Sequence, residues 1–345
     1  MARIVAHGED CAACENPVPP HRGPRVARRY EFPVREAATA LVSVGQGLSY
    51  TKTADRARLR AGRPRASVAS AQLVANWVEV LAPMVTAPHA EVSWPETIVA
   101  DTTRFVVTNR VTRKRTLGFV LLVVWGYPEG ERRGRLWAVR AVREAKAADW
   151  MALFQSLPGT PALMITDMAR APVAAAQELW GPSGPVPKYC EWHLRKAAAQ
   201  LIHPYGVAHI GSAELNLLKG AFRTLEGWQA FKDMATRHVN LDEWVRRHDA
   251  HISNQIVHRA TLPQHHGSGA VDAAILEIRQ FMEPRSFSYR NADRTNRMLE
   301  LVRLRINQSD DVDDYAASIR TFLDSGGRLT AQGTIRDPAG KHSLR

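Results

Sequence analysis

Two aspartates lie beside extended apolar segments of the sequence. Asp101 interrupts the segment 97–107, and Asp167 directly follows the segment 161–166, which is almost wholly apolar. Such a segment is typical of a strand buried on both faces. Carboxylate oxygens are ligands that hard cations such as Mg²⁺ or Mn²⁺ prefer, and two such ions can promote phosphodiester displacement. Because an aspartate after a strand can instead cap the next helix or begin a turn, neither residue identifies a site alone.

The order of the expected elements predicts how these two aspartates are positioned. The pattern indicates three strands (97–107, 118–125, 136–142), a helix (145–157), a strand (161–166), a helix, a strand (188–191) and a helix. Charged turns between the first three strands favour an antiparallel meander. The order β-β-β-α-β-α-β-α is that of the ribonuclease-H-like α/β fold. In that fold, an aspartate of the first strand and one at the C-terminal end of the fourth lie side by side.

The N-terminal part of the chain contains a candidate surface for a polyanion. Apolar residues at three- and four-residue spacing predict a helix over 33–44, and Gly45-Gln46-Gly47 ends it. Ser49 can cap a second helix that runs to Arg60. Two short helices joined by a glycine turn are typical of a helix-turn-helix DNA reader, although an ordinary helical hairpin with a solvated basic face gives the same pattern. The basic residues of this region are Lys52, Arg56, Arg58, Arg60, Arg63 and Arg65, and only Asp55 faces them.

Composition and charge favour a nucleic-acid partner and no membrane. The 345 residues carry a net charge of +12, and residues 1–66 alone contain twelve Lys or Arg against six Asp or Glu. A field of that sign attracts polyanions such as DNA. No run of 18 apolar residues could span a bilayer, and three cysteines do not suggest a disulfide framework. We expect a soluble, cytoplasmic protein.

Three sequence elements together resemble the Mutator-like superfamily of DDE transposases. They are Asp101-Thr102-Thr103-Arg104-Phe105, then Thr166-Asp167, then Cys190-Glu191-Trp192-His193-Leu194-Arg195-Lys196. The resemblance covers about residues 95–310 and is greatest to actinobacterial insertion-sequence members that carry an N-terminal helix-turn-helix. It implies metal-dependent cleavage of element ends and strand transfer into target DNA, by a homo-oligomer acting on double-stranded DNA in the bacterial nucleoid.

The resemblance also implies a third acid, which follows a Thr/Ser-Asn/Gly-x-x pattern after a helical insertion. Ser268-Gly269-Ala270-Val271-Asp272 fits that spacing, but Asp272 replaces the family's glutamate. Aspartate is shorter by one methylene, which puts catalytic competence in doubt, and Glu277 and Glu300 are the alternatives. Cys190 and His193 form the family's C-x-x-H element and are expected beside the acidic site. Arg195 and Lys196 are expected on the DNA backbone or on a solvated helix face.

Cys11 and Cys14 form an isolated C-x-x-C near the N-terminus. With His7 and His21 they could supply four ligands to Zn²⁺. The spacing matches no common zinc finger, so a flexible segment is the other interpretation.

These observations predict the organisation of the whole chain. It comprises a flexible or C-x-x-C segment (1–32), a helix-turn-helix domain (33–66), a linker helix (67–92), a ribonuclease-H-like core (93–200 and 263–310), a helical insertion (201–262) and a C-terminal helix and tail (311–345). The predicted function is that of a DDE transposase with Asp101, Asp167 and Asp272 as metal-binding catalytic acids. The alternative is a catalytically inactive, transposase-derived DNA-binding protein.

Overall fold

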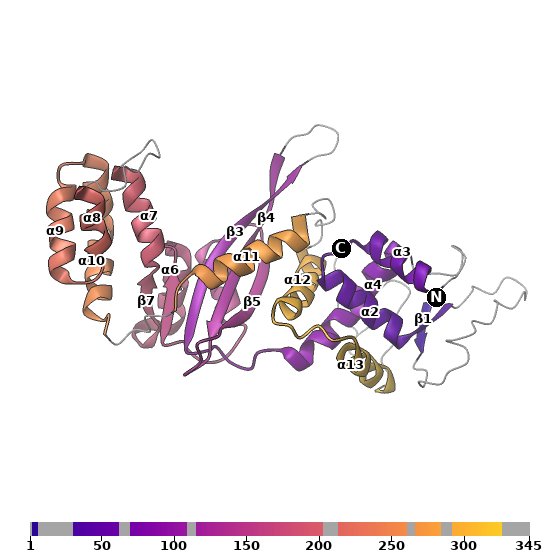
Figure 1. Cartoon of the computed structure of the whole chain (residues 1–345). Helices are drawn as coiled ribbons and strands as arrows, with labels where there is room; N and C mark the ends of the chain where they lie inside the picture. The colour runs from indigo at the N-terminus through magenta and orange to yellow at the C-terminus, as the bar shows by residue number, and fades with distance from the viewer. Residues whose placement is uncertain are drawn as a thin grey trace, which may run out of the picture.

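The computed structural model describes residues 2–5, 30–61, 70–108, 115–202, 213–260, 266–283 and 292–325. Within these ranges the molecule is elongated (Figure 1). A group of helices lies at one end, a mixed sheet lies in the middle, and helices from both ends of the sequence lie together at the other end.

The central sheet has the strand order β5-β4-β3-β6-β7. Its strands are β3 (Thr97–Thr108), β4 (Arg115–Tyr127), β5 (Arg135–Val142), β6 (Leu163–Thr166) and β7 (Val186–Tyr189). The first three strands pair antiparallel, as the predicted meander requires, and β6 and β7 run parallel to β3. The chain is therefore a mixed α/β protein. The strand predicted over 188–191 begins and ends two residues earlier, because Glu191 already begins a helix.

Alternation along the strands gives the sheet two buried faces. Val99 and Ile165 contribute to the core beneath α11 (Gly269–Met282), whereas Ile98 and Met164 contribute to the core beneath α5 and α6. The latter two helices span Ala147–Phe154 and Arg170–Trp180. Both faces of the short strand β6 are covered, which explains why its sequence is continuously apolar rather than alternating.

Helices that are far apart in the sequence share one core at the N-terminal end of the molecule. They are α2 (Val34–Gly45), α3 (Tyr50–Ala61), α4 (Ala71–Thr86), α12 (Ala292–Ile306) and α13 (Val312–Asp324). Gly45 lies so close to α12 that a Cβ there would come within 2.9 Å of the Leu301 carbonyl oxygen. Glycine is therefore required for the helix contact itself, while Gly47 (φ +91°) makes the turn into α3. The Ser49 Oγ accepts a hydrogen bond from the Lys52 N–H, at the predicted helix start.

The sequence-based prediction of α4 was wrong in one respect. The apolar spacing of the sequence predicts a helix here that Pro83 and Pro88 end, but Pro83 lies inside α4 and the helix continues to Thr86. A proline costs a helix one backbone hydrogen bond. Its neighbours Val80, Leu81 and Val85 are buried against the shared core, so packing compensates for that loss.

The helices of the region predicted as an insertion have a core of their own. They are α7 (Glu191–Ile202), α8 (Ala213–Gly220), α9 (Leu225–Ala235) and α10 (Val239–Val257). Trp228, Phe231 and Trp244 are all buried there. Gln255 connects α10 to the sheet: its side-chain amide accepts from the Tyr189 N–H at 2.9 Å and donates to the Tyr189 carbonyl at 3.0 Å.

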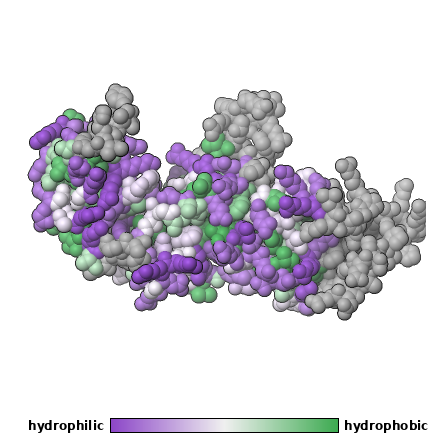
Figure 2. All heavy atoms as spheres, in the orientation of Figure 1, coloured by the Kyte–Doolittle hydropathy of each residue, from purple (hydrophilic) through white to green (hydrophobic). Residues whose placement is uncertain are grey.

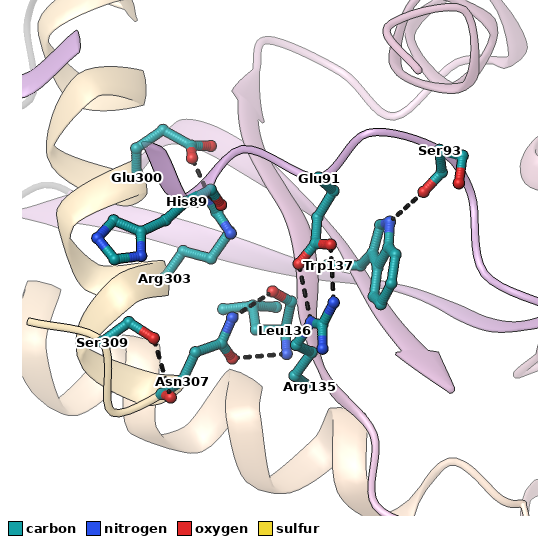
Figure 3. Close-up of polar contacts among 10 residues, drawn as sticks. All are labelled: His89, Glu91, Ser93, Arg135, Leu136, Trp137, Glu300, Arg303, Asn307 and Ser309. Carbon is teal, nitrogen blue, oxygen red and sulfur yellow. Dashed lines mark hydrogen bonds and ion pairs between the residues drawn. The ribbon is translucent and has the colours of Figure 1, made fainter. Parts of the chain in front are cut away.

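Two asparagines make the same kind of contact with β5, the strand at the opposite edge. Asn296 and Asn307 each accept from the N–H of one β5 residue and donate to the carbonyl of the same residue, Ala141 and Leu136 respectively (Figure 3 shows Asn307). Residues five apart in a regular strand direct their backbone groups to opposite sides. A bulge at Trp137 inserts one extra residue, so both Leu136 and Ala141 face the asparagines.

Further polar contacts hold the chain around this edge (Figure 3). The Trp137 indole donates to the Ser93 carbonyl, and Arg135 makes a bidentate ion pair with Glu91.

β1 (Ala2–Val5) and β2 (Tyr30–Pro33) form a separate parallel pair. Short 3₁₀ helices η2 (Ala87–His89) and η3 (Gly181–Ser183) complete the described elements.

The visible surface is largely polar. Hydrophilic residues cover most of the face shown in Figure 2, and hydrophobic residues gather there only in small groups. None of the helices in the described ranges is long and apolar enough to cross a bilayer.

The asparagine contacts predict a specific loss of stability. Asn307→Ala should lower the free energy of unfolding by about 1–3 kcal/mol, because a partly buried N–H and carbonyl of Leu136 both lose their partner. Urea unfolding measures the change. Asn216→Ala, which removes a single exposed bond to Lys219, is the matched control and should cost less than about 0.5 kcal/mol. Equal losses in the two variants would contradict a structural role for the edge contact.

Candidate active site

The parallel strands β6 and β7 end at one level of the sheet, beside the middle of β3. The last paired residues are Ala100 with Thr166 and Thr166 with Tyr189, so the next residue on each strand is Asp101, Asp167 or Cys190. The Cys190 N–H donates to the Thr166 carbonyl at 2.8 Å, which continues this alignment. Since adjacent strands lie about 4.8 Å apart, the parallel pairing brings these three residues together.

Asp101 occupies the most enclosed position of this group. Its side chain is 9% exposed, and its Oδ1 accepts a hydrogen bond from the Thr102 N–H at 2.6 Å. Burial, followed by the charges of Asp167 and Asp272, raises the pKa of Asp101 from its ordinary 3.8 to about 7, against the opposing effect of the Thr102 bond. The charges of the other two aspartates predicted from the sequence therefore act on Asp101 in the folded chain.

The backbone directly after Asp167 is strained. Met168 has a φ of +75°, in the left-handed region that residues other than glycine rarely adopt. This conformation lets the Ala169 N–H donate to the Asp167 carboxylate at 3.2 Å. The Met168 side chain packs against the core of the α7–α10 helices, which supplies contacts that offset the strain.

Asp272 lies in the first turn of α11 and is exposed. Its Oδ2 accepts a hydrogen bond from Ser268 at 3.3 Å. The hydroxyl of Ser268, which is buried, also lies 3.0 Å from the Cys190 sulfur and 3.4 Å from the His193 Nδ1. Ser268 thus joins the C-x-x-H element to the third carboxylate.

Sequence reasoning used Ser268 only as part of a spacing pattern. Its position four residues before Asp272, one helical turn, is the signal that could have indicated a side-chain contact with that acid.

The two alternative third acids have other surroundings. Glu300 belongs to α12, forms an ion pair with Arg303 (Figure 3), and lines a separate cleft with Pro83 and Trp137. Glu277 lies five residues after Asp272 on α11, which places it about 140° around the helix. Of the three, Asp272 is the one whose charge raises the pKa of Asp101.

The carboxylate oxygens suit a hard divalent cation, but the three carboxylates are not all close to one another. Within the described residues no three His, Cys, Asp or Glu side chains are close enough together to hold a metal ion. Mg²⁺ commonly binds through one or two carboxylates plus water and substrate phosphates. Asp101 and Asp167 therefore fit such an ion as a pair, and Asp272 would have to move towards them to complete a triad.

The predicted DNA-contacting and zinc-binding residues are only partly described. Lys52 and Arg56 are exposed on α3, and the backbone of Arg58 and Arg60 continues that helix. Arg195 pairs with Glu191 at 3.4 Å, and the Lys196 Nζ lies 4.8 Å from the Trp192 ring centroid. Arg63, Arg65, Cys11 and Cys14 lie outside the described residues, as do His7 and His21.

The sequence did not indicate that Lys188 and Arg259 lie near Cys190. Lys188 is 6% exposed, and its burial lowers its pKa below the ordinary value of 10.5. Glu191 forms ion pairs with both Arg195 and Arg259, a residue that follows α10. No local sequence pattern connects residues 188 and 259, so this cluster could not be predicted from the sequence.

The fold and site define the class of protein: a mixed α/β chain in which Asp101 of β3 and Asp167 lie beside the C-terminal end of the parallel strand β6. A scan against models of known protein families and a search of curated proteins each give no match. A functional assignment therefore depends on the site itself.

The crowded carboxylates predict a pH-dependent penalty on stability. The pKa of Asp101 is higher in the folded chain than in the unfolded chain. Its protonated carboxyl group therefore contributes stability that is complete below about pH 4 and is lost as the pH rises through 7. Asp101→Asn cannot undergo this loss. In EDTA the melting temperature of Asp101→Asn should increasingly exceed that of the wild type as the pH rises from 4 to 8. The corresponding difference in the free energy of unfolding should be a few kcal/mol at most, because a tenfold change in proton affinity equals ~1.4 kcal/mol.

Asp233→Asn, at an exposed position of α9, is the control and should show no such trend. A constant difference between Asp101→Asn and wild type across this pH range would contradict a raised pKa of Asp101 in the folded chain.

Proposed function

We propose that this chain is a metal-dependent enzyme that cuts DNA and rejoins it, a DDE transposase built on a ribonuclease-H-like core. The observation that carries the proposal is that Asp101, Asp167 and Asp272 come from distant parts of the sequence and that the charges of the latter two raise the pKa of the buried Asp101. Structural proteins gain nothing from carboxylates that repel one another, whereas active sites commonly contain such perturbed groups.

The strand arrangement supports the same proposal. Numbered along the chain within the central sheet, the strands have the order 3-2-1-4-5, with the first three antiparallel and the last two parallel to the first. This is the arrangement expected of a ribonuclease-H-like core. Asp101 lies in its first strand and Asp167 directly follows its fourth, the positions that the resemblance to Mutator-like transposases assigns to the first two acids.

The residues of the site have separable roles in the proposed reaction. Asp101 and Asp167 would hold a divalent cation, and Asp272 would complete the site from α11. Such ions, when bound, stabilise charge on the attacking and leaving oxygens of a phosphodiester. A water oxygen would form a bond to phosphorus while the 3′-oxygen of the cleaved strand leaves as a hydroxyl. That hydroxyl would then attack target DNA, a step that rests on the family resemblance.

The charge of the chain supports DNA as the substrate. Exposed Lys52 and Arg56 on α3 belong to the basic N-terminal region, and the net charge of +12 favours non-specific attraction to duplex DNA. We propose that α2 and α3 form the helix-turn-helix that recognises element ends, and that the active form is a homo-oligomer on DNA.

One observation favours the alternative, an inactive DNA-binding descendant. The third acid is aspartate where the family has glutamate, and the described residues contain no group of three metal ligands. The cleavage experiment separates the two functions.

Cleavage of DNA that carries the sequences flanking the gene tests the proposal. With Mg²⁺ or Mn²⁺ the wild type should cut at the boundary, and Asp101→Ala, Asp167→Ala and Asp272→Ala should each lower the rate at least about a hundredfold, because each removes a proposed ligand. Glu277→Gln and Glu300→Gln should retain the rate within about threefold. Tight binding without cutting in either metal would exclude the enzyme and favour the DNA-binding descendant.

The contacts of Ser268 predict a second effect on the same assay. Ser268→Ala removes the link between Cys190, His193 and Asp272, and should lower cleavage or Mn²⁺ affinity about 10–100-fold, as loss of a residue that orients a metal ligand does. Ser253→Ala is the matched control, because Ser253 makes the same one-turn bond to Asp249 on α10. If both variants keep wild-type metal affinity and rate, Ser268 has no positioning role.

A further inference from the structure

A cationic cluster lies around Tyr189, the last residue of β7. It consists of Arg170, which begins α6, and of His248 and His251 on α10. The Tyr189 ring contacts both histidine rings, with centroid distances of 5.9 Å to His248 and 5.1 Å to His251. The charge of Arg170 acts on both Tyr189 and His248. Elements that are far apart in the sequence therefore bring their basic side chains to one place.

The cluster carries positive charge that the chain itself does not balance. Arg170 and His251 are exposed and His248 is half-buried, and within the described ranges none of the three forms an ion pair. Burial, followed by the charges of Arg247, His251 and Arg170, lowers the pKa of His248 below its ordinary 6.5. Every charged group that acts on His248 is thus a basic one.

The acidic residues nearest to His248 in the sequence have partners elsewhere. Asp249 pairs with Lys232 of α9, and Glu243 pairs with Arg247 one turn along α10. The cluster is therefore suited to an anion supplied by a partner molecule.

The position of the cluster indicates which anion. Arg170 follows Asp167 by three residues, so their Cα atoms are at most about 11 Å apart. Met168, between them, packs against the same helical core as Tyr189. A DNA strand advances about 3.4 Å per nucleotide along the helix axis. A strand held at Asp167 would therefore present its next few phosphates to the cluster.

We propose that this cluster binds the phosphate backbone of the DNA strand beside the carboxylates, with Arg170 as a permanent charge and His248 and His251 as charges that form by proton uptake on binding. The inference rests on the proposed function, since it assumes that DNA occupies the acidic site. An arginine stays charged and suits phosphate geometry, whereas a histidine gains its charge near neutral pH when an anion is close. DNA affinity should therefore rise as the pH falls.

Binding of a labelled duplex that carries the sequences flanking the gene tests this inference. Every full-length chain carries Asp101→Asn and is titrated in EDTA, because Asp101 also titrates near pH 7 and cleavage must be prevented. The affinity of this parent chain should rise about five- to tenfold as the pH falls from 8 to 6. The double variant His248→Gln, His251→Gln should lose most of that rise. His251→Arg, which has a permanent charge, should bind at pH 8 about as tightly as the parent chain at pH 6.

The salt dependence tests the arginine. Arg170→Gln should weaken binding about five- to tenfold at every pH and lower the slope of log affinity against log salt by about one, as loss of one phosphate contact does. A duplex of scrambled sequence should show the same differences, because phosphates carry no sequence information. Arg237→Gln and His238→Gln are the matched controls. They lie at the start of α10, about 15 Å along the helix from His248, and should change affinity less than about twofold.

Each outcome distinguishes this inference from the proposed function. Cluster variants that bind like the controls, or a pH-dependent rise that persists without both histidines, overturn the inference. Either result together with metal-dependent cleavage by the wild type, lost in Asp101→Ala, means that the backbone site alone fails. Loss of binding in the cluster variants without cleavage by the wild type means that the enzyme proposal alone fails.

Discussion

The parallel pairing of β3, β6 and β7 is the interaction on which the candidate site depends. Strand pairing at a fixed register places Asp101, Asp167 and Cys190 side by side where β6 and β7 end, on the sheet face that α11 covers. A slip of one residue in β6 would move Asp167 to the opposite face of the sheet, away from Asp101. The buried residues on both faces of this four-residue strand therefore determine the geometry of the carboxylates.

Burial makes the ionised form of Asp101 unfavourable. The charges of Asp167 and Asp272 raise the pKa of Asp101 further, so the folded chain maintains a repulsion that unfolding would relieve. Val271, Ile278 and Met282 hold α11, and with it Asp272, against the sheet despite this repulsion. Strain at Met168, directly after Asp167, is a second cost at the same place. Both costs are located where the proposed chemistry occurs, which is the distribution expected of an active site rather than of a structural edge.

Side-chain amides bond to backbone groups at both edges of the sheet. Gln255 bonds to Tyr189 of β7, and Asn296 and Asn307 bond to Ala141 and Leu136 of β5. Exposed strand edges favour pairing with other chains. Each amide also connects the sheet to one end of the molecule, Gln255 to the α7–α10 helices and the asparagines to the helices around α12.

The sequence by itself determined the α/β class, the antiparallel meander, the buried fourth strand and the two aspartates beside strands, because those features depend on local periodicity. It also indicated the helix break at Gly45 and Gly47 and the Ser49 cap. Only the tertiary structure decided that Asp272, and neither Glu277 nor Glu300, acts electrostatically on Asp101. It alone connected Ser268 with Cys190 and His193, placed Pro83 inside a helix, and joined α2 to α12. Those outcomes depend on contacts between residues far apart in the chain, whose free energies no local pattern contains.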